Sequence, residues 1–309
     1  MKVLRGDPAT WNPEGQRRAA AIGVFDGLHL GHRSVLADLA RRATAQKLTT
    51  AVVTFDPHPL AVISPERAPL LLTTLDHRLE LFAEAGVDLV AVVEFGDEIR
   101  RLSPADFVTT VLVDGLGVGL VMVGTDFRFG RDRQGDADAL IALGREHGFD
   151  TEIVSLVGDS EPVSSSHIRQ LVASGDVVAA AHLLTRPHEV IGTVVPGEGR
   201  GRTIGVPTAN VAVTPGIALP ARGVYAVTAS PDGGHWFDGV ANLGTRPTFD
   251  GVIETLEVHL FDTDTDLYGA ELRVRFIDRI RDEQRFADVD ALVAQIAVDM
   301  ATARRIHAG

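Results

Sequence analysis

The hydrophobic pattern of the chain changes near residues 184–187, and this change constrains the fold more than any other feature. From Ala19 to about Leu156, short apolar runs alternate with longer amphipathic ones, which is typical of a parallel sheet covered by helices. After Pro187, strand-like runs follow one another between glycines and prolines with no helical pattern between them, which favours a closed antiparallel barrel. With 309 residues, the chain is long enough for two domains, and we predict them at residues 1–186 and 187–309.

The first domain is predicted to be a doubly wound, Rossmann-like α/β domain. Near-continuous apolar runs indicate strands that are buried on both faces, at Ala19–Phe25, Thr50–Phe55, Leu89–Glu94, Leu120–Gly124 and Glu152–Leu156. Helices are predicted between them at His32–Gln46, Leu75–Ala85, Pro104–Val113 and Ala137–His147, the third with Ser103 as N-cap. Such sheets bind ligands beyond the carboxyl ends of their strands, so the loops after Phe25, Phe55 and Gly124 are the candidate site.

The second domain is predicted to be a six-stranded antiparallel barrel followed by one helix. The strands are expected at Glu189–Val195, Asn210–Val213, Val224–Ala229, Phe237–Leu243, Thr255–Leu260 and Leu272–Ile277. The helix is expected at about Val289–Arg305.

Charge and composition exclude several classes of function. The 29 Lys and Arg residues against 42 Asp and Glu give a net charge of −13, which argues against nucleic acid as the main partner. The chain has no cysteine, so it has neither disulfides nor thiolate metal sites. No apolar stretch reaches the roughly 18 residues of a membrane span, so we expect a cytoplasmic protein without a membrane partner.

The segment Gly23–His32, GVFDGLHLGH, carries the first candidate site. It turns tightly after a strand and enters a helix, whose first N–H groups and dipole attract anions. Gly27 and Gly31 permit close backbone approach to such an anion. With a nucleoside triphosphate there, His29 and His32 would stabilise charge on the α-phosphate during in-line displacement, with pyrophosphate leaving. The candidate phosphate-binding residues of this segment are Gly23, Phe25, Asp26 and Gly31.

Two other interpretations of this segment are weaker. In the first, the histidines cap the helix in a glycine-rich connection, which would be the default for an isolated HxxH. In the second, they bind zinc, but metalloproteases use HExxH with the two histidines four residues apart, and that motif is absent.

Further loops offer groups that suit an aromatic, phosphorylated ligand. TFDPHP after the second strand supplies Phe55, Pro57, His58 and Pro59, and GTDFRFGR after the fourth supplies Asp126, Phe127 and Arg128, with Phe129 and Arg131 beside them. For the second loop, another interpretation is equally well supported by the sequence. In it, both phenylalanines belong to the core and both arginines are solvated, and none of them binds a ligand. In SSSHIR, the helix start supplies the candidate phosphate ligands Ser165, Ser166 and Arg169.

The second candidate site is GEGRGRTIGVPTAN, residues 197–210, between the first two barrel strands. Its backbone amides would wrap phosphates, with Gly199 and Arg202 as candidates, and Thr208 and Asn210 are oxygen ligands suited to Mg²⁺. It is not a Walker loop, since no Lys follows a second glycine as GxxxxGK[ST] requires. For GRGR alone, a turn-rich connection would be the default interpretation.

Glu257 is the candidate base of this second site. In the strand Glu254–Leu260, Glu257 and His259 share one face, so Glu257 would accept a proton from a substrate hydroxyl that attacks a γ-phosphate. A solvent-facing Glu is the common alternative, and Glu254 competes for the role. Tyr268, Arg281 and Phe286 are further candidates for contact with a ring or a phosphate.

Taken in order, these motifs resemble the prokaryotic bifunctional riboflavin kinase/FAD synthetase family over nearly the whole chain. The resemblance implies an N-terminal nucleotidyltransferase domain that converts FMN and ATP to FAD and pyrophosphate. It also implies a C-terminal flavokinase barrel that converts riboflavin and ATP to FMN and ADP. Both steps would use Mg²⁺, and the partners would be these small molecules, with the protein a monomer or a weak homo-oligomer.

The resemblance also assigns roles by position. His29 and His32 would stabilise adenylyl transfer, Asp126 would occupy the acidic or amide position of the VGxDF loop, and Ser165, Ser166 and Arg169 would hold ATP phosphates. Thr208 and Asn210 would bind Mg-ATP, with Glu257 as the catalytic base. The flavin-binding candidates are Phe55, Pro57, His58, Pro59, Asp126, Phe127, Arg128, Tyr268, Arg281 and Phe286.

The chain departs from the family pattern at two places. His167 stands where the family commonly has a cation in SSTRIR, which weakens phosphate attraction near neutral pH. Thr185 and His188 replace a turn glycine and an aromatic of LLGRPY, which affects the geometry of the domain junction. Two alternatives stay open: only one half is catalytically active, or the barrel is a flavin-binding or regulatory module.

Overall fold

The computed structural model describes residues 1–12, 14–154, 163–197, 201, 205–231, 233–248, 251–263 and 265–309, with only the backbone of 246–248 and 251–253. The chain divides into two compact units. The first unit comprises Met1–Pro69 and Leu75–Ser164, and the second comprises Leu70–Thr74 and Ser165–Gly309. The boundary at residue 186 predicted from the sequence stays a prediction.

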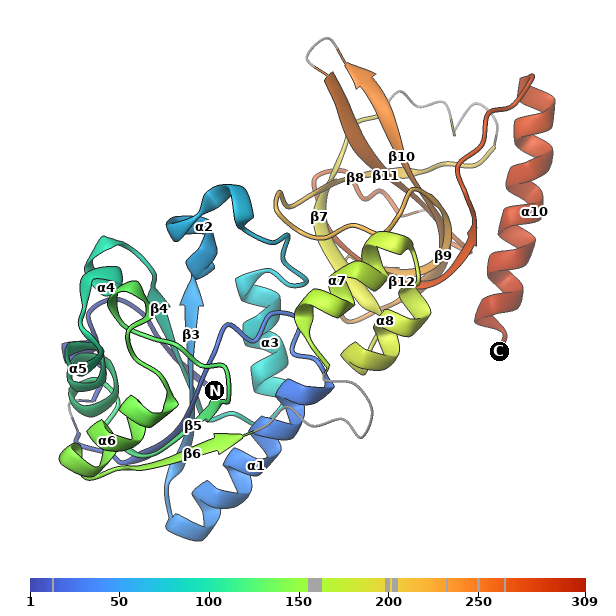
Figure 1. Cartoon of the computed structure of the whole chain (residues 1–309). Coiled ribbons are helices and arrows are strands. Elements are labelled where there is room, and N and C mark those ends of the chain that lie inside the picture. Colours follow the sequence, from blue (N-terminus) through green and yellow to red (C-terminus); the bar gives the residue numbers. More distant parts are fainter. Residues whose placement is uncertain are drawn as a thin grey trace. The chain divides into compact units, whose positions relative to one another are not determined.

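The first unit contains a six-stranded parallel sheet in the order β1-β4-β3-β2-β5-β6. Figure 1 labels β3, β4, β5 and β6 of this sheet. The chain runs outward from β2 through β3 to β4 and then returns to the other side of β2 with β5, so the strand order reverses beside β2. Ligands bind at such a reversal in doubly wound sheets. The strands are β1 (Lys2–Leu4), β2 (Arg18–Ile22), β3 (Thr49–Asp56), β4 (Leu89–Glu94), β5 (Val118–Gly124) and β6 (Asp150–Val154).

Helices cover both faces of this sheet. Along β2, Ala19 and Ala21 join one core with α1 and α3, while Ala20 and Ile22 join a second core that includes side chains of the segment 104–114. This alternation confirms the predicted doubly wound α/β fold. The helical elements are η1 (Pro8–Thr10), α1 (Leu30–Gln46), α2 (Pro59–Ile63), η2 (Pro65–Arg67), α3 (Leu75–Glu84), α4 (Asp97–Arg101), α5 (Pro104–Phe107), η3 (Val108–Asp114), η4 (Arg131–Arg133) and α6 (Ala137–His147).

Besides the unpredicted short helices α2 and α4, the first unit shows three main differences from the expectations. The strand expected to reach Phe25 ends at Ile22, because Phe25 has a φ of 54° and cannot continue a strand. The predicted helix over residues 104–113 is a short α5 capped by Ser103, followed by the π-helical η3. The edge strand β1 was not predicted, because three residues show no measurable period.

The second unit is a closed antiparallel barrel in the order β10-β11-β8-β7-β12-β9, which confirms the predicted six strands. All six strands extend beyond their predicted ranges, β10, β11 and β12 by the most, and α8 was not predicted. The strands are β7 (His188–Val195), β8 (Ala209–Val213), β9 (Gly223–Ser230), β10 (Phe237–Thr248), β11 (Gly251–Leu260) and β12 (Glu271–Arg281). The helices are α7 (Ser165–Ser174), α8 (Val177–Leu184) and α10 (Val289–His307).

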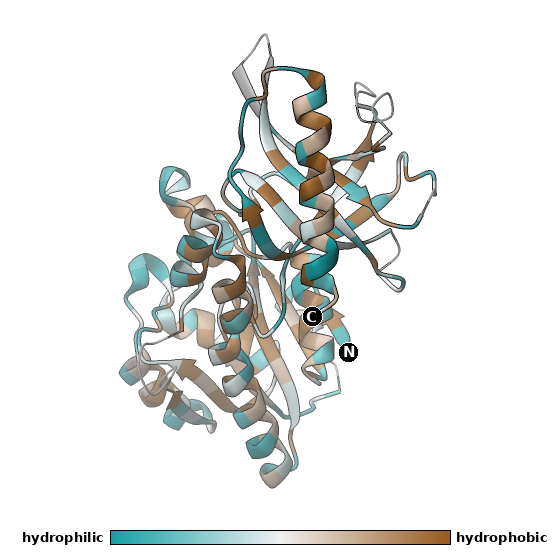
Figure 2. Cartoon of the chain, turned by 90° about the vertical axis from the view of Figure 1, so that its right-hand side faces the viewer, coloured by the Kyte–Doolittle hydropathy of each residue, from teal (hydrophilic) through white to brown (hydrophobic). Residues whose placement is uncertain are grey.

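The predicted C-terminal helix is confirmed as α10, which runs beside the barrel in Figure 1. Its apolar side chains, including Met300, Ala303 and Ile306, pack with Val224 and Val240 of the barrel. Figure 2 shows both hydrophobic and hydrophilic stretches along α10, as expected of a helix with one buried face.

Two departures from the family pattern have visible structural consequences. Thr185 is the C-cap of α8 in the left-handed region, with a φ of 61°, which is the conformation that a turn glycine adopts without strain. His188 is buried beside Phe276, and its Nε2 lies 2.8 Å from the carbonyl oxygen of Ala218. The imidazole therefore fills a buried aromatic position with its polar atom satisfied.

Candidate active sites

The loop after β2 is held in a strained, buried conformation. Phe25 and Leu28 both have positive φ angles, 54° and 38°, with Gly27 at 80° between them. The N–H of Leu28 donates to the carbonyl of Phe25 at 3.0 Å and closes the turn. Strain of this kind persists only where the surroundings enforce it, and it is commonly found at functional sites.

His29 ends this loop as the N-cap of α1. Its Nδ1 accepts a hydrogen bond from the backbone N–H of His32 at 3.4 Å. An accepting Nδ1 in a neutral imidazole leaves the proton on Nε2, so His29 presents an N–H donor. His29 is therefore a helix cap, and its Nδ1 makes the capping contact. This role is compatible with phosphate binding through Nε2.

The imidazoles of His29 and His32 lie together. Their ring centroids are 3.6 Å apart with an interplanar angle of 17°, and Phe25 contacts His32 edge-on at 5.1 Å. Burial lowers the pKa of His32 well below its usual range, and His29 and Arg78 lower it further. His32 is therefore neutral at physiological pH. Its Nδ1 is buried without a hydrogen-bond partner among the described residues.

Arg78 of α3 is a functional candidate that the sequence analysis missed. It is 2% exposed, and its guanidinium donates to the carbonyl oxygen of Val24 at 2.7 Å, while Thr54 Oγ1 donates to the same oxygen at 3.0 Å. Burial lowers the pKa of Arg78, and Asp26 and Asp56 raise it. A buried cation thus lies behind the HxxH loop. The available signal was its place on the buried stripe of α3, beside Leu81 and Phe82.

The loop after β3 leads into the short helix α2. The Asp56–Pro57 peptide bond is cis, and His58 caps α2 by accepting from the N–H of Leu60 at 3.1 Å. Phe55 is half-buried against Phe95, with ring centroids 5.9 Å apart, and Pro57 is exposed while Pro59 is half-buried.

The loop after β5 divides its aromatic residues between the core and the surface. Phe129 is buried in the core and stacks on the half-buried Phe127 with centroids 5.4 Å apart. Asp126 and Arg128 are exposed, as is Arg131, and Arg128 donates to the carbonyl of Phe127 at 2.8 Å. The core interpretation therefore describes Phe129, whereas Asp126 and Arg128 remain accessible to a ligand.

Ser165, Ser166 and Arg169 lie in the first turns of α7, which belongs to the second unit. The guanidinium of Arg169 donates to Ser166 Oγ at 3.4 Å. This contact groups a hydroxyl and a cation at one helix start.

The barrel carries a cavity of about 750 Å³ that contains five of the predicted site residues. These are Thr208, Asn210, Glu257, Arg281 and Phe286. Tyr268 instead lines a neighbouring cavity of about 390 Å³, which shares Thr208 with the first. Gly199 and Arg202 lie outside the described residues.

Strand register places Glu257 between two amides. In β11 it pairs with Asn210 of β8 on one side and with Asn242 of β10 on the other, and all three line the larger cavity. Leu256 and Val258 point the opposite way into the barrel core, as the alternation predicted. The cavity is therefore on the outer face of these strands. Asn242 was missed because it lies in an ordinary strand pattern.

The loop that brings Thr208 to the cavity is fixed by nearby contacts. His259 Nδ1 lies 2.7 Å from the carbonyl oxygen of Pro207, so Nδ1 carries the proton. The N–H of Val206 donates to the carbonyl of Gly201 at 2.8 Å. A Cβ at Gly197 would overlap the Asn210 side chain, so a larger residue there would displace this side chain.

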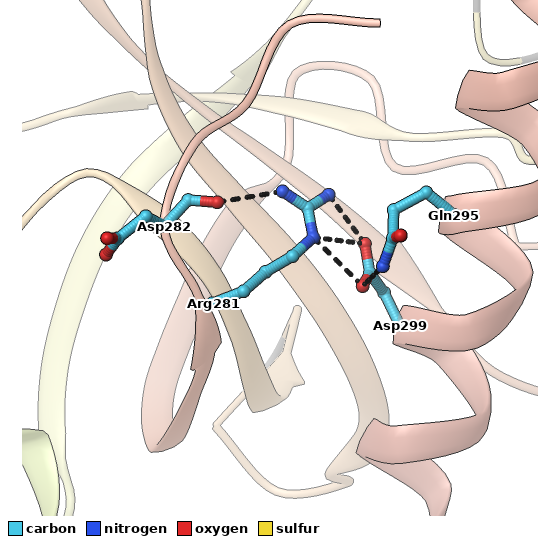
Figure 3. A network of polar contacts seen from close by, with 4 residues as sticks. All are labelled: Arg281, Asp282, Gln295 and Asp299. Carbon is cyan, nitrogen blue, oxygen red and sulfur yellow. Dashed lines mark hydrogen bonds and ion pairs between the residues drawn. The ribbon is translucent and has the colours of Figure 1, made fainter.

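Arg281 lies in the cavity wall as an ion pair with Asp299 of α10 (Figure 3). Its Nη2 donates to Asp299 Oδ2 at 2.7 Å, its Nε lies 3.0 Å from both carboxylate oxygens, and its Nη1 donates to the Asp282 carbonyl at 2.8 Å. Gln295 Nε2 donates to Asp299 Oδ1 at 2.8 Å. The guanidinium carbon lies 5.8 Å from the centre of the Phe286 ring.

Comparison with known proteins assigns a family to each half of the chain. The FAD synthetase family model matches residues 12–167, and the riboflavin kinase family model matches residues 184–307. A bifunctional riboflavin kinase/FMN adenylyltransferase from Escherichia coli K12 is 41% identical, covering 98% of this chain and 97% of its own length. Its counterpart in Pseudomonas fluorescens is 43% identical, covering 100% and 98%.

The chain belongs to the bifunctional riboflavin kinase/FMN adenylyltransferase family. The predicted family and the predicted transferase class are therefore confirmed. A bifunctional riboflavin kinase/FMN adenylyltransferase from Bacillus subtilis is 36% identical over 94% of this chain and 93% of its own.

A solved structure supports the same fold for this family member. It is described as a macrolide-efflux protein from Streptococcus pneumoniae, and it superposes with a TM-score of 0.88 at 29% identity over 98% of this chain and 99% of its own. Among the described residues of our chain, no helix is long and apolar enough to span a membrane.

Proposed function

We propose that this chain makes FAD from riboflavin in two steps at two separate sites. The barrel transfers the γ-phosphoryl group of ATP to riboflavin, giving FMN and ADP. The α/β unit then transfers the adenylyl group of a second ATP to FMN, giving FAD and pyrophosphate. The single observation that carries the proposal is that each half belongs to its own enzyme family and holds a formed polar site.

In the barrel, Glu257 is proposed as the catalytic base. The flavin hydroxyl attacks the γ-phosphorus of ATP, its proton passes to the Glu257 carboxylate, and ADP leaves. Asn210 and Asn242 flank Glu257 in register and fix where the hydroxyl is received. Arg281, Phe286 and, in the neighbouring cavity, Tyr268 are proposed flavin contacts.

Thr208 and Asn210 are proposed to hold Mg²⁺ together with ATP. The fit rests on their hydroxyl and amide oxygens, which both line the cavity beside Glu257. Mg²⁺ usually takes only one or two protein oxygens and completes its shell with phosphate and water. When bound, the ion offsets charge on the transferring phosphoryl group. Gly199 and Arg202, which lie outside the described residues, are proposed phosphate ligands from the sequence of their loop.

In the α/β unit, the N-terminus of α1 is proposed to hold the α-phosphate. Nε2–H of His29 donates to the oxygen where charge grows, and neutral His32 stacks on it and holds it in place. Gly23, Phe25, Asp26 and Gly31 are proposed to contribute to this phosphate site. Phe55, Pro57, His58, Pro59, Asp126, Phe127 and Arg128 are proposed flavin contacts. In the second unit, Ser165, Ser166 and Arg169 at the start of α7 are proposed phosphate ligands, as expected from the sequence.

A time course with purified protein, riboflavin, ATP and Mg²⁺ tests both activities, with the flavins separated by chromatography. We expect FMN to appear first and FAD to follow. FMN accumulating without FAD would contradict the adenylyltransferase assignment. Flavin binding without any product, with oxidised or reduced flavin, would favour the alternative that the barrel only binds or regulates.

A further inference from the structure

The stripe of α10 that faces the barrel contains one buried carboxylate. Leu292, Ile296, Met300 and Ala303 recur at the spacing of an amphipathic helix, and Asp299, only 3% exposed, falls on the same face. A hydrophobic residue at this position would dock the helix at least as well, because a buried ion pair contributes little net stability relative to apolar packing. The acidic residue therefore calls for an explanation other than helix docking.

The geometry of the ion pair between Asp299 and Arg281 supplies this explanation. The Asp299 carboxylate accepts hydrogen bonds from two guanidinium nitrogens of Arg281, and Gln295, one helical turn earlier, donates to the same carboxylate (Figure 3). Together with the Asp282 carbonyl, these contacts engage all three nitrogens of the guanidinium. A planar, doubly hydrogen-bonded pair of this kind fixes orientation as well as position.

Both members of the pair line the larger cavity with Phe286. The charge of Arg281 is offset by Asp299, so the pair presents a flat surface of no net charge beside an aromatic ring. Such a surface suits a neutral, planar ring system better than a phosphate, which would favour an uncompensated cation. The phosphate groups of ATP are accordingly expected at the Thr208 side of the cavity.

We propose that Asp299 is a positioning residue for the flavin: with Gln295 it holds the Arg281 guanidinium flat in the cavity wall, where it receives the ring system of riboflavin. This inference rests on the proposed kinase function. In the absence of Asp299, the long Arg281 side chain would be free to adopt other rotamers, and binding the flavin would have to order it. The loss should therefore appear in riboflavin binding and leave the phosphoryl transfer step unchanged.

A second ion pair between α10 and the barrel provides a matched control. Arg304 contacts Asp262 at 3.0 and 3.1 Å, both side chains are exposed, and neither lines the cavity. Asp262 has a φ of 57°, which asparagine tolerates, so Asp262→Asn removes this ion pair without backbone strain. It tests whether attachment of α10 alone explains any effect.

The experiment measures kinase kinetics of full-length wild type, Asp299→Asn and Asp262→Asn, together with riboflavin affinity from flavin fluorescence without ATP. For Asp299→Asn we expect the KM and Kd for riboflavin to rise about tenfold, with kcat and the KM for ATP within about twofold. Asp262→Asn should leave all four values within about twofold.

Three results would overturn the inference. These are riboflavin constants unchanged in Asp299→Asn, an equal rise in Asp262→Asn, and a fall in kcat alone. Should Asp299→Asn fail to fold by circular dichroism, Gln295→Ala decides, with a rise of about threefold expected and an unchanged KM contradicting the inference. Wild type that binds riboflavin but forms no FMN would instead refute the proposed kinase function, and the Kd comparison would still test Asp299.

Discussion

The two sites on this chain obtain their geometry in opposite ways. At the HxxH loop, the polar groups are enclosed: His29 is 1% exposed and Arg78 2%, in a turn that has positive φ at Phe25 and Leu28. At the barrel, Glu257 stands half-buried in an open cavity, and its neighbours follow from strand register. The first site depends on strain and buried charge, and the second on ordinary strand alternation.

This difference determines which substitutions should be tolerated. A regular strand holds its backbone when one side chain changes, so changes at the barrel site should affect chemistry without disturbing the fold. In the HxxH loop, the His29 cap, the strained turn and the buried Arg78 depend on one another. A substitution there therefore removes a chemical group and also disturbs the structure of the loop. The two activities of one chain make each site the control for the other.

The largest effect is expected for Glu257→Ala. Loss of the proposed base should lower riboflavin phosphorylation by about 10²–10⁴-fold, since general base catalysis contributes that much. FAD formation from supplied FMN should stay within about twofold of wild type. Rates of both reactions, measured separately by chromatography, provide the check.

A control variant sharpens this result. Glu254→Ala, in the same strand but exposed and not lining the cavity, should leave both activities unchanged. If Glu254→Ala abolished phosphorylation and Glu257→Ala did not, the assignment of the base would be wrong. If Glu257→Ala abolished both activities, the independence of the two sites would be wrong.

The next largest effect is expected for His29→Asn. Asparagine is a good N-cap, so α1 keeps its cap, but the Nε2–H donor is lost. FAD formation should fall by about 10²–10³-fold, the cost of removing one preorganised donor, while FMN formation is unchanged. Rates for His29→Ala and thermal unfolding of both variants complete the comparison.

His29→Ala separates the cap from the chemistry. It should lose the same activity and about 1 kcal/mol of stability in addition, because alanine cannot cap the helix. Retention of FAD formation in His29→Asn would show that the histidine is only a cap, which is the weaker interpretation drawn from the sequence.

The barrel site was more predictable from the sequence than the HxxH site. Glu257 and His259 were placed on one face because a strand alternates, and the structure has them so. Asn242 carried no such signal, since its importance comes from pairing with Glu257 across two strands. Register between strands is a tertiary property that a single sequence does not reveal.

At the first site, sequence motifs located the histidines but not their support. Arg78 is 46 residues from His32, and its role arises because α3 packs against the loop after β2. The end of β2 was misplaced at Phe25 because that residue is apolar, although its φ of 54° belongs to a turn. The fold enforces a strained turn at Phe25, although the hydrophobic pattern of the sequence predicts a strand there.

A smaller effect is expected for Arg78→Met, which removes the buried cation near His32. The wild-type pKa of His32 lies well below 6.5, so the ring is neutral at pH 6.5, where an ordinary histidine would be half protonated. Removing the nearby cation should raise this pKa, though burial and His29 keep it below its usual range. NMR titration of ring-labelled histidines measures it, with His32→Gln identifying the signal.

Adenylyl transfer should fall about tenfold in the same variant, because Val24 keeps only the hydrogen bond from Thr54. If Arg78→Met left the pKa of His32 and the rate of adenylyl transfer unchanged, the buried cation would have no role at the site. The enclosed site would then not differ from the open one in its electrostatics.

The smallest effect concerns strain outside either proposed site. Thr185 adopts a φ of 61° as the C-cap of α8 and lines neither barrel cavity. Its left-handed conformation therefore lowers the stability of the fold without serving either proposed reaction. That conformation costs a residue with a side chain about 1–2 kcal/mol, and the greater flexibility of unfolded glycine offsets part of it. Thr185→Gly should therefore stabilise the second unit by about 0.5–1 kcal/mol.

At that gain, the unfolding midpoint of the second unit should rise by about 1–4 °C in calorimetry, with both activities unchanged. Phe25→Gly is the informative partner, because it relieves the same kind of strain inside the HxxH loop and removes the ring that contacts His32. We expect it to lower FAD formation. If both variants gained stability and kept full activity, the strain at Phe25 would serve no purpose at the site, and the two positions would differ only in location.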